Sequence, residues 1–173
     1  MNPEITYIIN TLFLIFSATL IILMAPGFAM LEAGLVRSKN VVSVLTGNVM
    51  LYAVTSMVFL LWGYSLMFGG SGFFDGGIKQ STYSIYAIMF FQLAFVSKTV
   101  SIISGAVSER IRIWPFMAFA FLMAGFIYPV VGSWTWGGGF LKDLNGFAGS
   151  TVIHSVGGWA ALAAIILLGA RKG

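Results

Sequence analysis

The sequence lacks cysteine altogether and contains a single histidine. Without cysteine the chain has no disulfide framework, no thiolate nucleophile and no cysteine metal site, and the redox compartment cannot be inferred. No grouping of nucleophile, base and oxyanion donors is visible, and no metal-ligand spacing. These absences argue against a soluble-type enzyme, and the sequence predicts neither catalysis nor a bound cofactor.

Charged side chains are also scarce. They make up 8% of the 173 residues, whereas 59% are hydrophobic, a composition that belongs in the lipid phase. A membrane-spanning helix needs about 20 predominantly apolar residues, and five such stretches lie at about 8–30, 41–68, 83–107, 111–131 and 147–170. The predicted fold is an all-α integral membrane protein of five transmembrane helices, with residues 1–173 forming one membrane domain.

Most basic residues lie between these stretches. The loops after the first, third and fifth stretches hold six of them, Arg37, Lys39, Arg110, Arg112, Arg171 and Lys172, and the opposite side holds two, Lys79 and Lys142. Lysine and arginine are retained on the cytoplasmic side of a membrane. The sequence therefore predicts a multi-pass protein of the cell membrane with its N-terminus outside and its C-terminus in the cytoplasm, and it gives no nucleic-acid signal.

Two ionisable residues, His154 and Lys98, lie well inside apolar stretches, where each is a functional hypothesis by default. His154 shares a helical stripe with small residues at 150, 151, 157, 158 and 161. Such a stripe is typical of close helix packing. A narrow lumen lined by glycine, serine and imidazole is the alternative, and periodicity alone leaves both open.

Aromatic residues suggest a second feature. Phe91 and Phe95 are four residues apart, hence on one helix face, and Lys98 falls three residues further along the same stripe. Such stripes are more often core than gate. Glu32 and Gln92 add polar groups to the first and third stretches. Trp134 and Trp136 fall where an interfacial belt is expected, although an indole at a pore mouth could also hold a small cation.

Five segments in register resemble the ammonium transporter (Amt/Mep/Rh) family. They are AMLEAGLVRSKN at 29–40, Phe91-Gln92 with Phe95, SGAVSER at 104–110, WTWGGG at 134–139 and FAGSTVIH at 147–154. Their order and spacing run through the whole chain, so chance resemblance is a poor explanation.

The resemblance implies a role for each matching position. Trp136 and Phe95 correspond to an outer ammonium recruitment site, Phe91 and Phe95 to the outer pore and its gate, and His154 to the first of two pore histidines. It also implies ammonium or ammonia as the partner in the lipid bilayer and assembly as a homotrimer. Ammonium would lose its proton below the gate, neutral ammonia would pass, and the histidine pair would relay the proton.

The sequence departs from the family pattern in three ways. Family members have two inverted five-helix halves, whereas this chain matches the first half only. Gly146 stands where the family has an aspartate, and Asp143 three residues earlier is a candidate substitute as helix cap. Lys98 occupies a place near Phe95 that we expect to be apolar, and it would repel ammonium unless it is neutral, paired with Glu32 or another acid, or turned away.

These observations leave several hypotheses. The leading one is the N-terminal half of an ammonium transporter that needs a second-half polypeptide, with a cytoplasmic regulatory protein as a further candidate partner. The alternative is an ammonium-sensing membrane domain that signals without transport, motivated by Gly146 and Lys98. The remaining hypotheses are an inactive fragment and a five-span protein that assembles as antiparallel pairs, which the strong charge bias disfavours.

Overall fold

The computed structural model describes residues 2–70, 82–144, 146 and 149–171. Five helical stretches within them are long and apolar enough to span a membrane, as predicted. They are α1 (Pro3–Leu35); η1, α2, η2 and α3 in series (Ser38–Asn40, Val41–Val58, Phe59–Gly63, Tyr64–Phe68); α4 (Ile85–Val107); α5, η3 and α6 in series (Ile113–Leu122, Met123–Ile127, Tyr128–Thr135); and α7 (Ser150–Leu168). Lys79, Phe147, Ala148 and Lys172, which enter the predictions above, lie outside the described residues.

The elements are helices because a chain in lipid must satisfy its backbone polar groups internally. The first helix is longer at both ends than the predicted 8–30. Asn2 caps it by accepting a hydrogen bond from the Glu4 amide at 3.0 Å, and Pro3 takes the first turn, where its missing N–H costs nothing. The helix then continues through Pro26 to Leu35.

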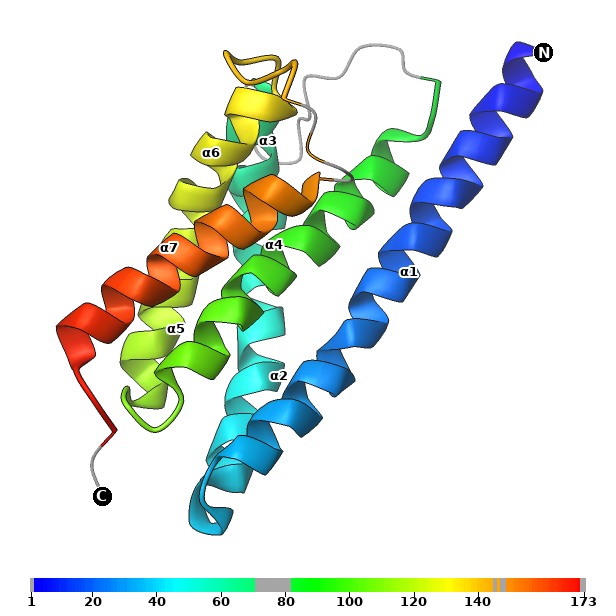
Figure 1. Cartoon of the computed structure of the whole chain (residues 1–173). Coiled ribbons are helices and arrows are strands. Elements are labelled where there is room, and N and C mark those ends of the chain that lie inside the picture. Colours follow the sequence, from blue (N-terminus) through cyan, green and yellow to red (C-terminus); the bar gives the residue numbers. More distant parts are fainter. Residues whose placement is uncertain (1, 71–81, 145, 147–148, 172–173) are drawn as a thin grey trace.

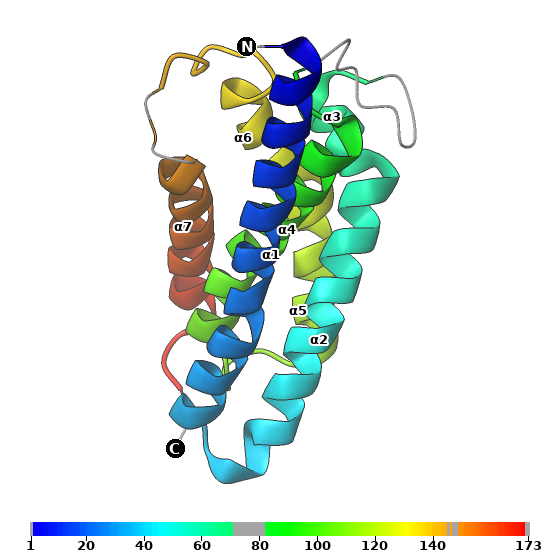
Figure 2. The same cartoon turned by 90° about the vertical axis from the view of Figure 1, so that its right-hand side faces the viewer.

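The central helix of the bundle is α4. It lies between α1 and α7 (Figure 1), packs on α2 as well, and is buried along most of its length. By contrast α1 crosses the outside of the bundle (Figures 1 and 2), and its buried residues are Ala18 and Glu32. The core has two clusters, one around Val100 and Met123 and one around Phe59, Phe95 and Tyr128.

Two spans are interrupted by π-helical turns, η2 and η3, that contact each other. The Trp62 indole donates a hydrogen bond to the Gly125 carbonyl at 3.0 Å. A Cβ atom added at Gly63 would lie 2.9 Å from the Ala124 carbonyl oxygen, and one at Gly125 would lie 2.9 Å from Val58 Cγ1. Only glycine allows so close an approach. The two π turns can pack against each other because each contains a glycine at the contact. Nothing in the apolar pattern predicted these turns.

One end of the bundle, here called the basic end, comprises residues 36–40, 108–112 and 169–171. Glu109 joins its three segments. The Glu109 carboxylate accepts hydrogen bonds from the Arg37 amide at 3.0 Å and the Asn40 side chain at 2.6 Å. It also pairs with the side chains of Arg37 at 3.2 Å and Arg171 at 3.7 Å. Glu109 has φ 63, a left-handed backbone that non-glycine residues rarely adopt.

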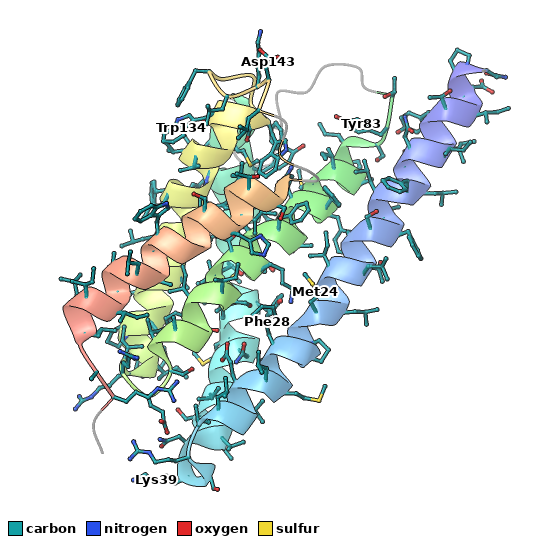
Figure 3. The ribbon with its side chains drawn as sticks, in the orientation of Figure 1. Met24, Phe28, Lys39, Tyr83, Trp134 and Asp143 are labelled. Carbon is teal, nitrogen blue, oxygen red and sulfur yellow. The ribbon has the colours of Figure 1, made fainter. Side chains whose placement is uncertain are left out.

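The opposite end, here called the aromatic end, comprises residues 82–84 and 132–144. Trp134 and Asp143 lie there and Lys39 lies at the basic end (Figure 3). The N-terminus lies at the aromatic end and the C-terminus at the basic end (Figure 1), as an odd number of spans requires.

Glu109 should make stability depend on pH. The hydrogen bond from Asn40 and then that from the Arg37 amide lower the pKa of Glu109 from 4.5 to about 2. Because the folded pKa is depressed, the stabilisation is complete above pH 4.5 and is lost as pH falls toward 2. We expect Glu109→Gln to unfold more easily than wild type at neutral pH in detergent micelles, and this difference to shrink through that window. Asp143→Asn, on an exposed loop residue, is the control, and a difference independent of pH would contradict the assignment.

Candidate functional site

Three aromatic side chains meet at the end of α4 that lies in the aromatic end of the bundle. The Phe91 and Phe95 rings contact edge to face, with centroids 4.5 Å apart and planes at 82°. Phe95 also faces the indole of Trp136, with centroids 6.4 Å apart and planes only 10° from parallel. We call Phe91, Phe95 and Trp136 the aromatic cluster. It joins α4 to the residue that ends α6.

Trp136 is held from two sides. Its amide donates to the Gly132 carbonyl at 2.8 Å, closing the last turn of α6. On the other side lies Gly149, with φ 74, immediately before α7. A Cβ atom at Gly149 would lie 2.2 Å from Trp136 Cζ2, so the indole occupies space that any other residue would fill. The sequence motif contains this glycine, but its contact with Trp136 was not predicted.

His154 lies on an exposed face of α7. Its Nδ1 is 2.9 Å from the carbonyl oxygen of Ser150. The Ser150 hydroxyl oxygen lies 3.4 Å from the same nitrogen. A carbonyl only accepts, so a hydrogen bond to it requires the tautomer with hydrogen on Nδ1, which leaves Nε2 as the acceptor. The preceding residue, Ile153, is buried in the same core cluster as Phe95, with Trp136 packed against that cluster. One face of α7 therefore packs near the aromatic cluster, and the opposite, exposed face carries the imidazole of His154.

The small-residue stripe around His154 divides between the two predicted roles. Gly157 and Ala161 are buried, and a Cβ atom at Gly157 would lie 3.1 Å from the Thr99 carbonyl oxygen of α4. Thr151, His154 and Gly158 are exposed on the other side. Close packing therefore holds for Gly157 and Ala161, and the lumen lined by the other residues of the stripe stays a prediction.

Of the alternatives predicted for Lys98, the structure shows the side chain turned toward α1 and α2. Within the described structure it makes no ion pair with Glu32, and its Nζ has no hydrogen-bond partner. Instead Nζ lies 5.4 Å from the Phe28 ring centroid and 5.1 Å from that of Tyr52, on α1 and α2. A shift of three residues turns a side chain about 60° around the helix, which is enough to move Lys98 from the side of Phe95 to that of α1 and α2.

Glu32 is engaged elsewhere. Its carboxylate accepts a hydrogen bond from the Asn48 side chain at 2.8 Å and another from the Ser104 hydroxyl. Asn48 was not singled out in the sequence, and Ser104 entered only as the first residue of the SGAVSER segment. Lys98, Ser101, Ser104 and Ser108 nevertheless recur at helical spacing along α4 and its C-cap. That spacing was the signal for a polar face on this helix.

The candidate cap, Asp143, does not reach the start of α7. Asp143 is exposed in the loop after α6 (Figure 3), and the start of α7 has no side-chain cap, so Asp143 does not cap it. Gly146 lies beside the first turn of α7, where a Cβ atom would be 3.1 Å from Thr151 Oγ1. Trp134 packs on Phe140, with ring centroids 5.2 Å apart.

Gln92 belongs to the buried side of α4, next to the aromatic cluster. Its Oε1 accepts a long hydrogen bond of 3.4 Å from the Tyr128 hydroxyl. Among the described residues no group of three or more His, Asp or Glu side chains is arranged to hold a metal ion.

The sequence matches the Ammonium Transporter Family over residues 12–173. It is 42% identical to a putative ammonium transporter of Synechocystis sp., with 98% of this chain and 42% of the relative covered. It is 36% identical to the ammonium transporter Amt2 of Archaeoglobus fulgidus, covering 99% and 40% respectively. For the ammonium transporter of Bacillus subtilis the values are 38%, 94% and 44%. The chain thus spans about two fifths of the length of these curated relatives.

The contact between Gly149 and Trp136 can be tested with two alanine variants. Gly149 and Gly138 both have positive φ, 74 and 79, but a Cβ atom at Gly138 meets nothing within 4 Å. Both variants carry the same backbone strain, and only Gly149→Ala displaces the indole. We expect Gly149→Ala to unfold more easily by about 1–3 kcal/mol beyond Gly138→Ala, as overpacking does.

A double-mutant cycle in detergent micelles checks the cause. The extra loss should disappear when Trp136 is replaced by alanine. Equal losses for Gly149→Ala and Gly138→Ala would show that the indole is not fixed by this contact.

Proposed function

This chain belongs to the ammonium transporter family, and on that premise we propose that it supplies the first half of an ammonium conduction pathway. The single observation that carries the proposal is the parallel pair of rings, Phe95 and Trp136, at one end of the bundle. The aromatic rings would bind ammonium, and the imidazole of His154 would contact neutral ammonia. The start of α7, the helix that carries His154, lies against these rings.

The aromatic cluster is suited to receive ammonium. The faces of indole and phenyl rings attract a cation, by about 0.5–2 kcal/mol depending on how far it is desolvated. In Phe95 and Trp136 two such faces are nearly parallel, and Phe91 contacts the Phe95 ring at nearly a right angle. A cation held there exchanges part of its water shell for ring faces before it reaches the apolar interior.

Past this site a charged solute meets a large desolvation cost, whereas neutral ammonia does not. His154 offers Nε2 as an acceptor, because Nδ1 is committed to the Ser150 carbonyl. Imidazole can take up and release a proton, so the ring can contact ammonia or pass the proton that ammonium leaves behind. Lys98 does not oppose this route, since its side chain lies between Phe28 and Tyr52.

A second half is needed to close the pathway. The polar side chains of His154 and Thr151 are exposed on α7, which is unusual for polar groups in lipid. Family folds of this type pair two inverted repeats with the solute path between them. We infer that a second-half polypeptide covers this face. The homotrimer and the cytoplasmic regulatory protein stay predictions.

Ammonium sensing without transport is the second candidate, favoured by Gly146. That residue stands where the family resemblance places an aspartate, and it leaves the start of α7 without a carboxylate. A sensor would bind ammonium at the same aromatic cluster and give no flux.

Transport and sensing are separated by reconstitution. The chain is placed in liposomes together with a second-half polypeptide of the family, and ammonium uptake is followed. We expect uptake, with Trp136→Leu raising the half-saturating ammonium concentration roughly 2- to 30-fold, which corresponds to about 0.5–2 kcal/mol. Trp134→Leu is the matched control, because this indole lies at the same end but packs on Phe140.

Binding of ammonium without uptake would favour the sensor. Equal behaviour of Trp136→Leu and Trp134→Leu would contradict the recruitment site. Full uptake by the chain alone would contradict the need for a second half.

The proposed orientation places the N-terminus outside. It follows from the six basic residues after the first, third and fifth spans, against two on the other side of the membrane. Because the chain has no cysteine, single cysteines give clean labels. Lys39 and Asp143 are exposed at opposite ends of the bundle (Figure 3). In intact cells a membrane-impermeant maleimide should label Asp143→Cys and spare Lys39→Cys until the cells are opened. The reverse pattern would invert the topology, and labelling of both in intact cells would indicate dual insertion.

A further inference from the structure

Lys98 is a buried lysine that the proposed conduction pathway does not use. It lies inside α4 and is only 3% exposed. Within the part of the chain that the structure describes, its Nζ has neither a hydrogen-bond partner nor a carboxylate at ion-pair distance. An ammonium group inside a membrane span is costly unless the protein supplies something in place of water. The groups around Nζ therefore need an explanation.

Two aromatic rings take the place of water around Nζ. The centroid of the Phe28 ring lies 5.4 Å from Nζ and that of the Tyr52 ring 5.1 Å. Phe28 is on the side of α1 that faces the bundle (Figure 3), and Tyr52 belongs to α2. The face of a ring attracts a cation within about 6 Å of its centroid, and more strongly when the cation is desolvated. Three helices thus meet around one ammonium group.

A carboxylate lies one helical turn from this group without contacting it. Glu32 is four residues after Phe28 on α1, and residues so spaced share a helix face. The carboxylate is buried and accepts hydrogen bonds from two neutral groups, the Asn48 side chain and the Ser104 hydroxyl. Its other side faces a cavity that Arg110 and further residues line. Glu32 therefore adds a negative field, and the ring faces remain the direct contacts of Nζ.

The bundle thus has two aromatic pairs that can hold a cation, both in contact with α4. Phe95 and Trp136 lie at the aromatic end. Phe28 and Tyr52 lie on α1 and α2, and the side chain of Lys98 reaches them from α4. A lysine side chain ends in a primary alkylammonium group, which is ammonium with one hydrogen replaced by carbon. Ring faces that suit one therefore suit the other.

We propose that Lys98 is a built-in alkylammonium ligand that fills a second cation–π site, made by Phe28 and Tyr52, and keeps free ammonium out of it. Because the amine is tethered to α4, its effective concentration at the rings is high and a dissolved cation competes poorly. Ammonium that enters at the aromatic cluster then has no second site between α1, α2 and α4. This last consequence rests on the proposed function.

Emptying the site should let a dissolved amine take the place of Lys98. Lys98→Ala removes Cγ, Cδ, Cε and Nζ, which are the heavy atoms of n-propylammonium. In detergent micelles, n-propylammonium chloride should raise the unfolding temperature of Lys98→Ala in a saturable way relative to sodium chloride at the same ionic strength. The uncharged 1-propanol, with as many heavy atoms, should not. Lys98→Met, whose side chain fills the space, should not respond to the amine.

The two rings can be tested in the same assay. In the Lys98→Ala background, Phe28→Leu should raise the half-saturating n-propylammonium concentration several-fold, because one of the two ring faces is lost. Phe13→Leu is the matched control, since Phe13 is an exposed ring on the same helix. Equal rescue by n-propylammonium and 1-propanol would show that the space selects shape and not charge, and would overturn the proposal.

Wild type supplies a measurement that does not depend on how Lys98→Ala folds. With ¹⁵N-labelled lysine, the Nζ resonance that is missing from Lys98→Met belongs to Lys98. At neutral pH it should have the chemical shift of an ammonium group. The chemical shift of a free amine would overturn the proposal, because an uncharged nitrogen gains nothing from the ring faces as a cation does.

Trp136→Leu should leave the response of Lys98→Ala to n-propylammonium unchanged, which separates this inference from the transport proposal. Rescue by ammonium and methylammonium as well, with smaller rises in unfolding temperature, supports the full assignment. Rescue by n-propylammonium alone supports the built-in ligand and overturns its role against free ammonium. No rescue by any amine overturns the second site and leaves the aromatic cluster to be judged by uptake.

Discussion

The arrangement of this bundle depends on α4, a buried helix that contacts apolar and aromatic neighbours on one side and polar neighbours on the other. Toward α6 and α7, α4 presents the rings of Phe91 and Phe95. Toward α1 and α2 it presents Lys98 and Ser104. Lipid offers no hydrogen bonds to the second set. The polar side chains must therefore find partners inside the protein, and this requirement brings α1, otherwise little buried, against the bundle through Glu32.

The two faces also separate two kinds of chemistry within one helix. The aromatic face offers π electrons and no formal charge. The polar face offers Lys98 and the Ser104 hydroxyl, which donates a hydrogen bond to the Glu32 carboxylate of α1. The faces point to different neighbours: Lys98 lies beside Phe28 and Tyr52, whereas Trp136 lies beside Phe95.

Much of the fold could be predicted from the sequence, because length and apolar composition decide what spans a membrane. The pairing of Phe91 with Phe95 also followed from helical spacing. The direction of Lys98 did not, since 60° around a helix decides which neighbour a side chain meets. Asp143 was a candidate cap for the fifth span because it lies close to that span in sequence. In the structure it is exposed in the loop after α6. The role of Glu109 escaped notice because its partners come from two remote segments, which no local pattern reveals.

The π turns have a consequence for how Trp136 is aimed. Each residue of an α-helix adds about 100° of rotation, and a π turn accommodates one more residue than an α turn. In η3 the extra residue sets the angular phase of everything that follows, including the turn of α6 that ends at Trp136. Whether the indole faces Phe95 is therefore decided by how many residues separate it from the start of α5, as much as by its own identity. Shortening η3 by one residue would keep every side chain of the aromatic cluster in the chain and point one of them elsewhere.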